Sequence, residues 1–170
     1  CSLVLETALG YLRNVPTEIE RKFLVDSALW TPSSKGASIT QAYVCVEDTT
    51  VVRVRILDDK AFLTIKGKTE GLSRPEYEYP VPVSHAQEMI AAFGSKRCVE
   101  KLRFTEEHNG MTWEIDIFKG RNHPLILAEI ELESERQEFK RPSWLGREVS
   151  DDSRYYNSNL AIQPFRTWSD

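Results

Sequence analysis

Apolar and polar residues alternate with a period of two along most of this chain. Such alternation predicts β-strands with two different faces, because successive side chains of a strand point to opposite sides of the sheet. Short turn-like segments, such as Asp58-Asp59-Lys60 and His108-Asn109-Gly110, separate several strands and favour antiparallel neighbours. The pattern therefore predicts a mainly β domain. Eight segments show the alternation: 17–25, 39–46, 51–57, 61–67, 74–81, 99–107, 111–118 and 125–133.

Two helices are predicted beside these strands. Ser84 and Gln87 have the spacing of a capping box, and Gly94 is placed to end that helix. Ser150 is placed to cap a second helix, over about 151–160. Eight antiparallel strands with a few flanking helices favour a closed eight-stranded barrel, because closure leaves no exposed sheet edge. The alternative is an open sheet that is solvated on one face and packed on helices.

The organisation along the chain predicts a single domain over 17–170, preceded by an extension over 1–16. The sequence has 170 residues, which suits one domain, and it contains no long Gly/Ser linker, low-complexity tract or tandem repeat. In the extension, Leu5, Ala8, Leu9 and Leu12 predict a short amphipathic helix. A lipidated start at Cys1 is the alternative interpretation of these first residues.

The polar faces of seven strands carry charged residues that are sorted by sign. Neighbouring like charges repel, and a face that only needs solubility gains nothing from that cost. Cationic strands suit a polyanion, and carboxylate strands suit a hard divalent ion that the anion also binds. We therefore expect a site for a metal–polyphosphate complex inside a barrel that is polar within and apolar outside. The faces hold seven cations and nine carboxylates, namely Lys22, Arg53, Arg55, Lys66, Arg74, Lys101, Arg103, Glu18, Glu20, Glu76, Glu78, Glu114, Asp116, Glu129, Glu131 and Glu133.

The overall charge and the cysteines exclude several other classes. The formal net charge is −4, whereas a general nucleic-acid binder needs a basic excess. Cys1, Cys45 and Cys98 are odd in number and lack metal-site spacing, so neither a disulfide framework nor a zinc site is expected. No apolar run approaches the roughly 20 residues that cross a bilayer. We expect a cytoplasmic protein with no membrane and no nucleic acid among its partners.

The segment Glu18-Ile19-Glu20-Arg21-Lys22 resembles the ExExK signature of the CYTH domains, also called triphosphate tunnel metalloenzymes. The resemblance runs from about residue 17 to 165 and includes a C-terminal signature of small bacterial triphosphatases. Matching segments follow in the family's order: Gln41-Ala42-Tyr43, Arg53-Val54-Arg55, 63–67, 73–78, Lys101-Leu102-Arg103, 113–116, 128–132, 142–149 and Arg154-Tyr155-Tyr156-Asn157.

This resemblance implies an eight-stranded antiparallel tunnel, open at both ends, that binds triphosphate with divalent metal. Two Mg²⁺ or Mn²⁺ ions are expected, one bridging carboxylates and phosphates and one lowering the pKa of an attacking water. The implied phosphate ligands are Lys22, Arg53, Arg55, Lys66, Lys101 and Arg103. The implied metal ligands are Glu18, Glu20, Glu129 and Glu131, with Asp116, Glu76 and Glu78 as further ligands or orienting groups.

Three further residues receive roles from the same resemblance. Tyr43 aligns with a tyrosine that is tied to catalysis in part of the family, and Lys22 is the other candidate for the proton acceptor. Packing is the alternative role of Tyr43. Arg154 is expected either to close over the tunnel and bind substrate or to lie on a helix surface.

The function predicted from the sequence is metal-dependent hydrolysis of inorganic triphosphate to phosphate and pyrophosphate. The only expected partner is the small-molecule triphosphate, and the protein is expected to be a monomer or a homodimer. A class IV-type adenylyl cyclase and a thiamine triphosphatase use the same tunnel and remain alternatives. A non-catalytic polyphosphate-binding module is another. A lipocalin-like barrel for apolar ligands fits poorly with seven cations on the inner face.

Overall fold

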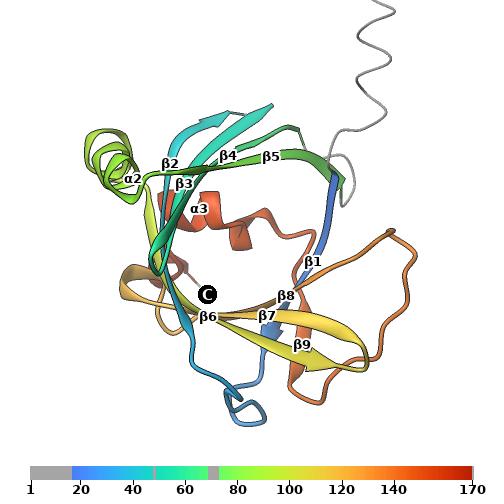
Figure 1. Cartoon of the computed structure of the whole chain (residues 1–170). Helices are drawn as coiled ribbons and strands as arrows, with labels where there is room; N and C mark the ends of the chain where they lie inside the picture. Colours follow the sequence, from blue (N-terminus) through green and yellow to red (C-terminus); the bar gives the residue numbers. More distant parts are fainter. Residues whose placement is uncertain (1–16, 48, 69–72, 170) are drawn as a thin grey trace, which may run out of the picture.

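The computed structural model describes residues 17–47, 49–68 and 73–169, and the helix predicted within 1–16 lies outside this range. The fold is mainly β with a few short helices (Figure 1). All strand pairs are antiparallel, as the short connections predict. The strands are β1 (Thr17–Val25), β2 (Ala37–Glu47), β3 (Thr50–Leu57), β4 (Lys60–Lys66), β5 (Ser73–Val81), β6 (Cys98–His108), β7 (Met111–Phe118), β8 (Ile126–Glu131) and β9 (Leu145–Glu148).

These strands form one strongly curved sheet with the order β5-β4-β3-β2-β6-β7-β8-β1-β9. In addition, β1 pairs with β5 through Thr17, Glu18 and Ile19, which lie opposite Pro75, Arg74 and Ser73. Figure 1 shows the sheet bending round so that β1 and β5, far apart in the strand order, approach each other. The inner face of this curve collects the charged positions of the alternating pattern.

The strand count was predicted as eight, and the described residues form nine strands. The eight predicted segments each correspond to a strand, with ends that differ by one or two residues. The additional strand, β9, has four residues and pairs with the outer edge of β1. It includes Gly146, where a Cβ atom would lie 2.9 Å from the carbonyl oxygen of Leu24. A strand this short gives too little alternation to be recognised in the sequence.

The predicted helices exist, but the two predicted N-caps, Ser84 and Ser150, are wrong. Helix α2 (Val83–Met89) begins after Pro82 without a side-chain cap and continues as the π-helical turn η2 (Ile90–Gly94), so Gly94 does end it. The Ser150 hydroxyl bonds to β1, and the C-terminal segment forms η4 (Ser153–Tyr155), α3 (Asn157–Ile162) and η5 (Phe165–Thr167). The remaining short helix is η3 (Gly120–Asn122). None of the described helices has the length and apolar character needed to cross a membrane.

Two apolar clusters cover much of the outer face of the sheet, as an inside-out arrangement requires. In one, Phe23 and Trp113 pack with Phe139 and Trp144, which belong to the long β8–β9 connection. In the other, Ala86 of α2 packs on strands β3 and β4. The outer face is therefore buried by a loop and a helix, which frees the inner face for polar side chains.

The inner face is not polar throughout, contrary to the sequence-based prediction. Val99, Phe118 and Leu127 each lie two residues from a charged residue of the same strand. They therefore share the inner face with these charged residues. They pack in one core with Leu160 and Ala161 of α3. Figure 1 shows α3 within the curve of the sheet. This end of the inner face is packed with apolar side chains, whereas the resemblance implied a tunnel open at both ends.

Candidate active site

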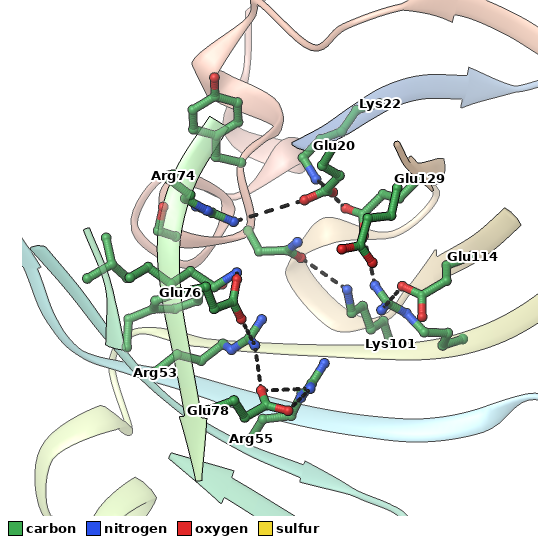
Figure 2. Close-up of a pocket in the computed structure, with 18 of the residues that line it drawn as sticks. Glu20, Lys22, Arg53, Arg55, Arg74, Glu76, Glu78, Lys101, Glu114 and Glu129 are labelled. Carbon is green, nitrogen blue, oxygen red and sulfur yellow. Dashed lines mark hydrogen bonds and ion pairs between the residues drawn. The ribbon is translucent and has the colours of Figure 1, made fainter. Parts of the chain in front are cut away.

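A cavity of about 360 Å³ lies on the inner face of the sheet, and we call it the charged cavity. Figure 2 shows lysine, arginine and glutamate side chains from many strands converging on it. Seven of its lining residues in the described chain are lysines or arginines, and six are glutamates. The lining residues are Glu20, Lys22, Tyr43, Val51, Arg53, Arg55, Lys66, Arg74, Glu76, Glu78, Lys101, Arg103, Thr112, Glu114, Glu129, Glu131, Ser150, Tyr156, Asn157 and Ser158.

Strands β3, β4 and β5 form one wall of the charged cavity. The Arg53 guanidinium donates to Glu78 at 3.1 Å and to the buried hydroxyl of Thr64 at 3.1 Å. Arg55 donates to both carboxylate oxygens of Glu78 at 2.9 Å. On the same wall, the Lys66 ammonium lies 2.5 Å from a carboxylate oxygen of Glu76. The strand register places each carboxylate of β5 beside a donor of β3 or β4.

Strands β1, β6, β7 and β8 form the opposite wall. The Lys22 ammonium donates to Glu20 and, at 2.5 Å, to Glu129, which lies opposite Lys22 in the register of β1 and β8. Arg103 donates to Glu129 at 2.9 Å and to Asp116 at 2.7 and 2.8 Å. The two walls meet where the Arg74 guanidinium of β5 lies 4.0 Å from Glu20 of β1. Cations from both walls thus line the same cavity.

Burial and neighbouring charges shift the pKa values of several groups in this second wall. Burial would lower the pKa of Lys22, but the carboxylates of Glu129 and Glu20 outweigh it and raise that pKa. Burial would raise the pKa of Glu129, but the charges of Lys22, Lys101 and Arg103 hold it well below its usual range. The pKa of Lys101 is lowered by burial and by Arg103. Lys22 and Glu129 therefore remain charged near neutral pH.

Tyr43 lies on the floor of the charged cavity and is only 3% exposed. Its phenol oxygen accepts a hydrogen bond of 2.9 Å from the side-chain amide of Gln41. Burial raises the pKa of Tyr43 to about 12, against the opposing effect of Arg53 and other cations. The register of β2 and β3 shifts between Tyr43 and Cys45, which marks a β-bulge beside the site. The phenol is protonated at neutral pH, so its hydrogen is available to a neighbouring acceptor.

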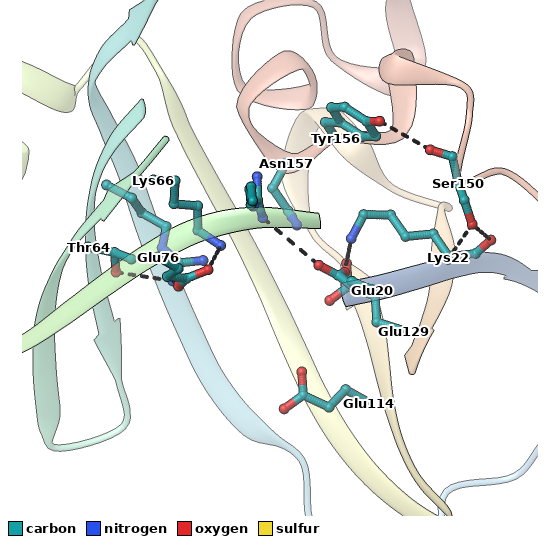
Figure 3. Close-up of polar contacts among 12 residues, drawn as sticks. Glu20, Lys22, Thr64, Lys66, Glu76, Glu114, Glu129, Ser150, Tyr156 and Asn157 are labelled. Atoms are coloured by element: carbon teal, nitrogen blue, oxygen red, sulfur yellow. Dashed lines mark hydrogen bonds and ion pairs between the residues drawn. The ribbon is translucent and has the colours of Figure 1, made fainter. Parts of the chain in front are cut away.

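The C-terminal segment supplies the remaining side of the charged cavity. The Ser150 hydroxyl accepts the backbone N–H of Lys22 at 2.9 Å and donates to Glu148 at 2.8 Å. The Tyr156 hydroxyl donates to the Ser150 carbonyl at 3.2 Å, as Figure 3 shows. Asn157 accepts a long hydrogen bond of 3.4 Å from the Lys101 ammonium. This side is neutral, in contrast to the two charged walls.

The structure brings twelve of the predicted site residues together around the charged cavity and places others elsewhere. Asp116 is fully buried behind the cavity lining, where it binds Lys101 at 2.5 Å and Arg103. Arg154 is exposed, pairs with Asp152 at 2.6 Å and is absent from the cavity lining. Glu18 lies in β1, and its side chain is outside the described part. The twelve are Glu20, Lys22, Tyr43, Arg53, Arg55, Lys66, Glu76, Glu78, Lys101, Arg103, Glu129 and Glu131.

Sequence reasoning left several lining residues without a role. Arg74 lies two residues before Glu76, and Glu114 lies two residues before Asp116, both of which had an assigned role. The alternation therefore indicated that the side chains of Arg74 and Glu114 point to the inner face. Ser150, Tyr156 and Asn157 lie in a segment without regular alternation. The C-terminal signature contains Tyr156 and Asn157 beside Arg154, but only packing on the inner core determines which of them faces the cavity.

The carboxylates suit a hard divalent ion in chemistry, although the described side chains do not form a preassembled site. Carboxylate oxygens are the ligands that Mg²⁺ and Mn²⁺ prefer. Among the described residues, however, no three histidine, cysteine, aspartate or glutamate side chains are grouped as a metal site. Instead, Glu20 and Glu129 meet at the Lys22 ammonium. The arrangement can bind a compact polyanion, because each cation has a donor geometry suited to phosphate oxygens.

The chain belongs to the CYTH domain family, whose model matches residues 16–159. This match agrees with the order of sequence motifs and with the charged inner face of the sheet. It covers every described strand and all of the described residues that line the charged cavity. The family assignment therefore accounts for both the architecture and the unusual sorting of charge on its inner face.

Several relatives have names that state an activity. The chain is 44% identical over 153 residues to the inorganic triphosphatase of Acetivibrio thermocellus, covering 90% of this chain and 98% of the relative. It is 37% identical over 150 residues to the inorganic triphosphatase of Nitrosomonas europaea, covering 86% and 97%. A crystal structure of the inorganic triphosphatase NE1496 superposes with a TM-score of 0.62 at 35% identity, covering 85% and 94%.

Proposed function

We propose that this protein hydrolyses inorganic triphosphate to phosphate and pyrophosphate in the charged cavity. The observation that carries this proposal is the convergence of seven lysine and arginine side chains on one cavity of the described chain. Relatives that this chain matches almost end to end are named inorganic triphosphatases, which supports the same substrate. We further propose that the β1–β5 pairing closes the sheet into a tunnel around the substrate. Closure would hold both charged walls at fixed separation.

The chain's own residues supply position and charge neutralisation, which are the main demands of phosphoryl transfer. Arg53 and Arg55 donate to oxygens of the bound triphosphate from one wall, and Lys101 and Arg103 donate from the other. Water attacks a terminal phosphorus, the bridging P–O bond breaks, and pyrophosphate leaves. The cations stabilise the negative charge that the leaving pyrophosphate gains. This role needs several fixed cations, and the cavity supplies them.

Lys22 and Tyr43 act as hydrogen-bond donors in this proposal. Both were predicted as candidates for the proton acceptor. The pKa of Lys22 is raised by Glu129 and Glu20 against the effect of burial, and burial raises that of Tyr43 to about 12. Both groups are protonated at neutral pH, so each can donate to a phosphate oxygen and neither is ready to accept a proton.

Divalent metal is part of the proposal. Glu20, Glu129 and Glu131 face the cavity and would hold Mg²⁺ or Mn²⁺, together with phosphate oxygens of the substrate. Bound metal supplies charge neutralisation and polarises water. Lys22 contacts two of these carboxylates, so its ammonium lies where it can donate a hydrogen bond to the phosphates of the bound substrate. Asp116 is proposed to orient Lys101 and Arg103 and not to bind metal, because it is fully buried behind them.

The lining favours inorganic triphosphate over a nucleotide. The only aromatic side chains that line the charged cavity in the described residues are Tyr43 and Tyr156. Tyr43 is buried, and Tyr156 uses its hydroxyl on the chain itself. Tyr43 therefore has no open ring face on which an adenine or thiazole would stack, and Tyr156 is the one aromatic residue of the described lining that is not buried. The cyclase and thiamine triphosphatase alternatives have at most this one ring to bind the organic group.

The test is release of phosphate and pyrophosphate from inorganic triphosphate, measured with Mg²⁺, Mn²⁺ or EDTA. We expect metal-dependent release of both products in equal amounts. Arg53→Ala should lower kcat/KM by about 10- to 100-fold, the value of a lost charge-assisted hydrogen bond. Arg154→Ala is the matched control, because Arg154 is exposed and lies outside the cavity lining, and it should retain activity.

The other outcomes identify the alternatives. Cyclic AMP formed from ATP, with no phosphate release from triphosphate, would replace the proposal with a cyclase. Binding of triphosphate without any product would indicate a polyphosphate-binding module. Equal losses in Arg53→Ala and Arg154→Ala would show that the cavity is not the site of the reaction.

A further inference from the structure

Asn157 presents an amide group to the charged cavity that the reaction described above does not use. It is the first residue of α3, is half-buried and lines the cavity. In the view of Figure 3, it lies between the Lys66–Glu76 pair and the group of Glu20, Lys22 and Glu129. A neutral side chain therefore lines a cavity whose two walls are charged.

The contact with Lys101 determines which way this amide faces. The Lys101 ammonium lies 3.4 Å from Oδ1 of Asn157. An ammonium can only donate, so the amide oxygen must be the atom that faces it. The amide nitrogen, Nδ2, is turned away from Lys101 and makes no hydrogen bond with the described residues. It has two N–H donors available for a ligand in the cavity.

The backbone around Asn157 is fixed by packing on both sides. Tyr155 and Leu160 are buried in the core beneath α3. Asn122 is also buried, donates to the Leu160 carbonyl at 3.3 Å and accepts the N–H of Phe165 at 2.8 Å. A donor held in place by such packing loses little freedom when a ligand binds. The amide is thus positioned before substrate arrives.

We propose that Asn157 is a substrate-binding residue whose Nδ2 donates a hydrogen bond to a phosphate oxygen of triphosphate. Its oxygen meanwhile accepts from Lys101, so one side chain links a cavity cation to the bound anion. The inference rests on the proposed function, because it names a further contact with the same substrate. It also explains why the C-terminal segment returns to the cavity, where it contributes a donor without adding another positive charge.

The test uses two substitutions that separate contact with substrate from support of Lys101. Asn157→Asp keeps an oxygen for Lys101 but removes both N–H donors. Asn157→Ala removes both interactions. We expect the KM for inorganic triphosphate to rise about tenfold in Asn157→Ala and at least as much in Asn157→Asp. The melting temperature of Asn157→Asp should stay within about 2 °C of the wild type, because its packing is unchanged.

Asn159→Asp is the matched control, since it makes the same change two residues further along α3. Asn159 donates to the Ser153 carbonyl at 2.7 Å and is outside the cavity lining, so its KM should be unchanged. A wild-type KM in Asn157→Asp would overturn the inference, because Lys101 support alone would then suffice. Equal rises in both aspartate variants would also overturn it, by showing a general charge effect. A wild-type protein that releases no phosphate from triphosphate would overturn the proposed function itself.

Discussion

At the scale of single residues, Asp116 is a carboxylate buried between two cations of the described site. It is fully buried, and its carboxylate binds both Lys101 and Arg103. Burial would raise the pKa of Asp116, but the charges of Arg103 and Lys101 lower it. Removing its charge leaves two cations facing each other in a dry environment, because Glu129 and Glu114 satisfy only Arg103.

We therefore predict that Asp116→Asn lowers the free energy of unfolding by about 3–5 kcal/mol, the cost of breaking a buried ion pair. Chemical denaturation measures this change. Glu114→Gln is the matched control, because Glu114 pairs with the same Arg103 from a position that is 45% exposed. We expect about 0–1 kcal/mol for it. Similar losses in both variants would show that burial does not decide the energetics of this network.

At the scale of elements, β9 and the residues after it fix the position of β1. Strand β9 ends at Glu148, and the Val149 N–H then donates to the Lys22 carbonyl at 2.8 Å. The Lys22 N–H donates to the Ser150 hydroxyl, which takes the place of a backbone carbonyl as its acceptor. Glu148 also holds Arg21 on the outer face of β1 through two hydrogen bonds of 2.7 and 2.5 Å. The backbone of Lys22 is thus held by the segment that follows β9.

Ser150→Ala leaves the buried N–H of Lys22 without its acceptor. We predict a loss of about 1–3 kcal/mol in the free energy of unfolding, the usual cost of an unsatisfied buried donor. Ser150→Thr retains the hydroxyl and should recover most of that stability. Urea denaturation of the two variants provides the comparison. If alanine and threonine are equally stable, the hydroxyl does not fasten β1.

The sequence predicts strands well here because the alternation has a physical origin on both faces. Outward residues such as Phe23 and Trp113 must be buried under loops, and inward residues such as Lys22 and Arg103 must face the cavity. Elements with no such alternation were predicted only in part, since a helix was expected over 151–160 but α3 begins at Asn157. Strand β9 is too short, and α3 owes its place to packing of Leu160 on the inner core.

The same distinction applies to the candidate site. The strand residues of the site followed from period two, and among those whose side chains are described, only Asp116 points to the inner side without reaching the cavity surface. In the C-terminal segment, the sequence indicated Arg154, whereas Tyr156 and Asn157 line the cavity. In an irregular segment, the position of a residue within a motif does not show where its side chain points, because this depends on long-range packing.

At the scale of the whole molecule, the charge network links stability to pH. Opposing cations hold the pKa of Glu129 well below its ordinary value of 4.5, against the effect of burial. As the pH falls, the Glu129 carboxylate therefore becomes protonated in the unfolded chain before it does so in the folded protein. The stabilisation from Glu129 is present above about pH 4.5 and is lost as the pH falls through the folded-state pKa.

We predict that Glu129→Gln flattens the acid side of the stability curve. One proton of difference between the folded and unfolded states corresponds to a slope of about 1.4 kcal/mol per pH unit. Denaturation between pH 3 and 7 should show a steeper decline in the wild type than in the variant, which starts from lower stability at pH 7. Parallel curves for the two proteins would contradict a lowered pKa at Glu129.

The charged cavity is expected to act on inorganic triphosphate in preference to a nucleotide. The sample contains inorganic triphosphate and ATP at equal concentrations, excess Mg²⁺ and a catalytic amount of enzyme. Phosphorus NMR of this sample measures that preference directly. Competition in one tube gives the ratio of the two kcat/KM values. The account predicts that triphosphate disappears first, into equal amounts of phosphate and pyrophosphate, while ATP persists. Consumption of ATP before triphosphate, or growth of a cyclic AMP signal, would contradict it.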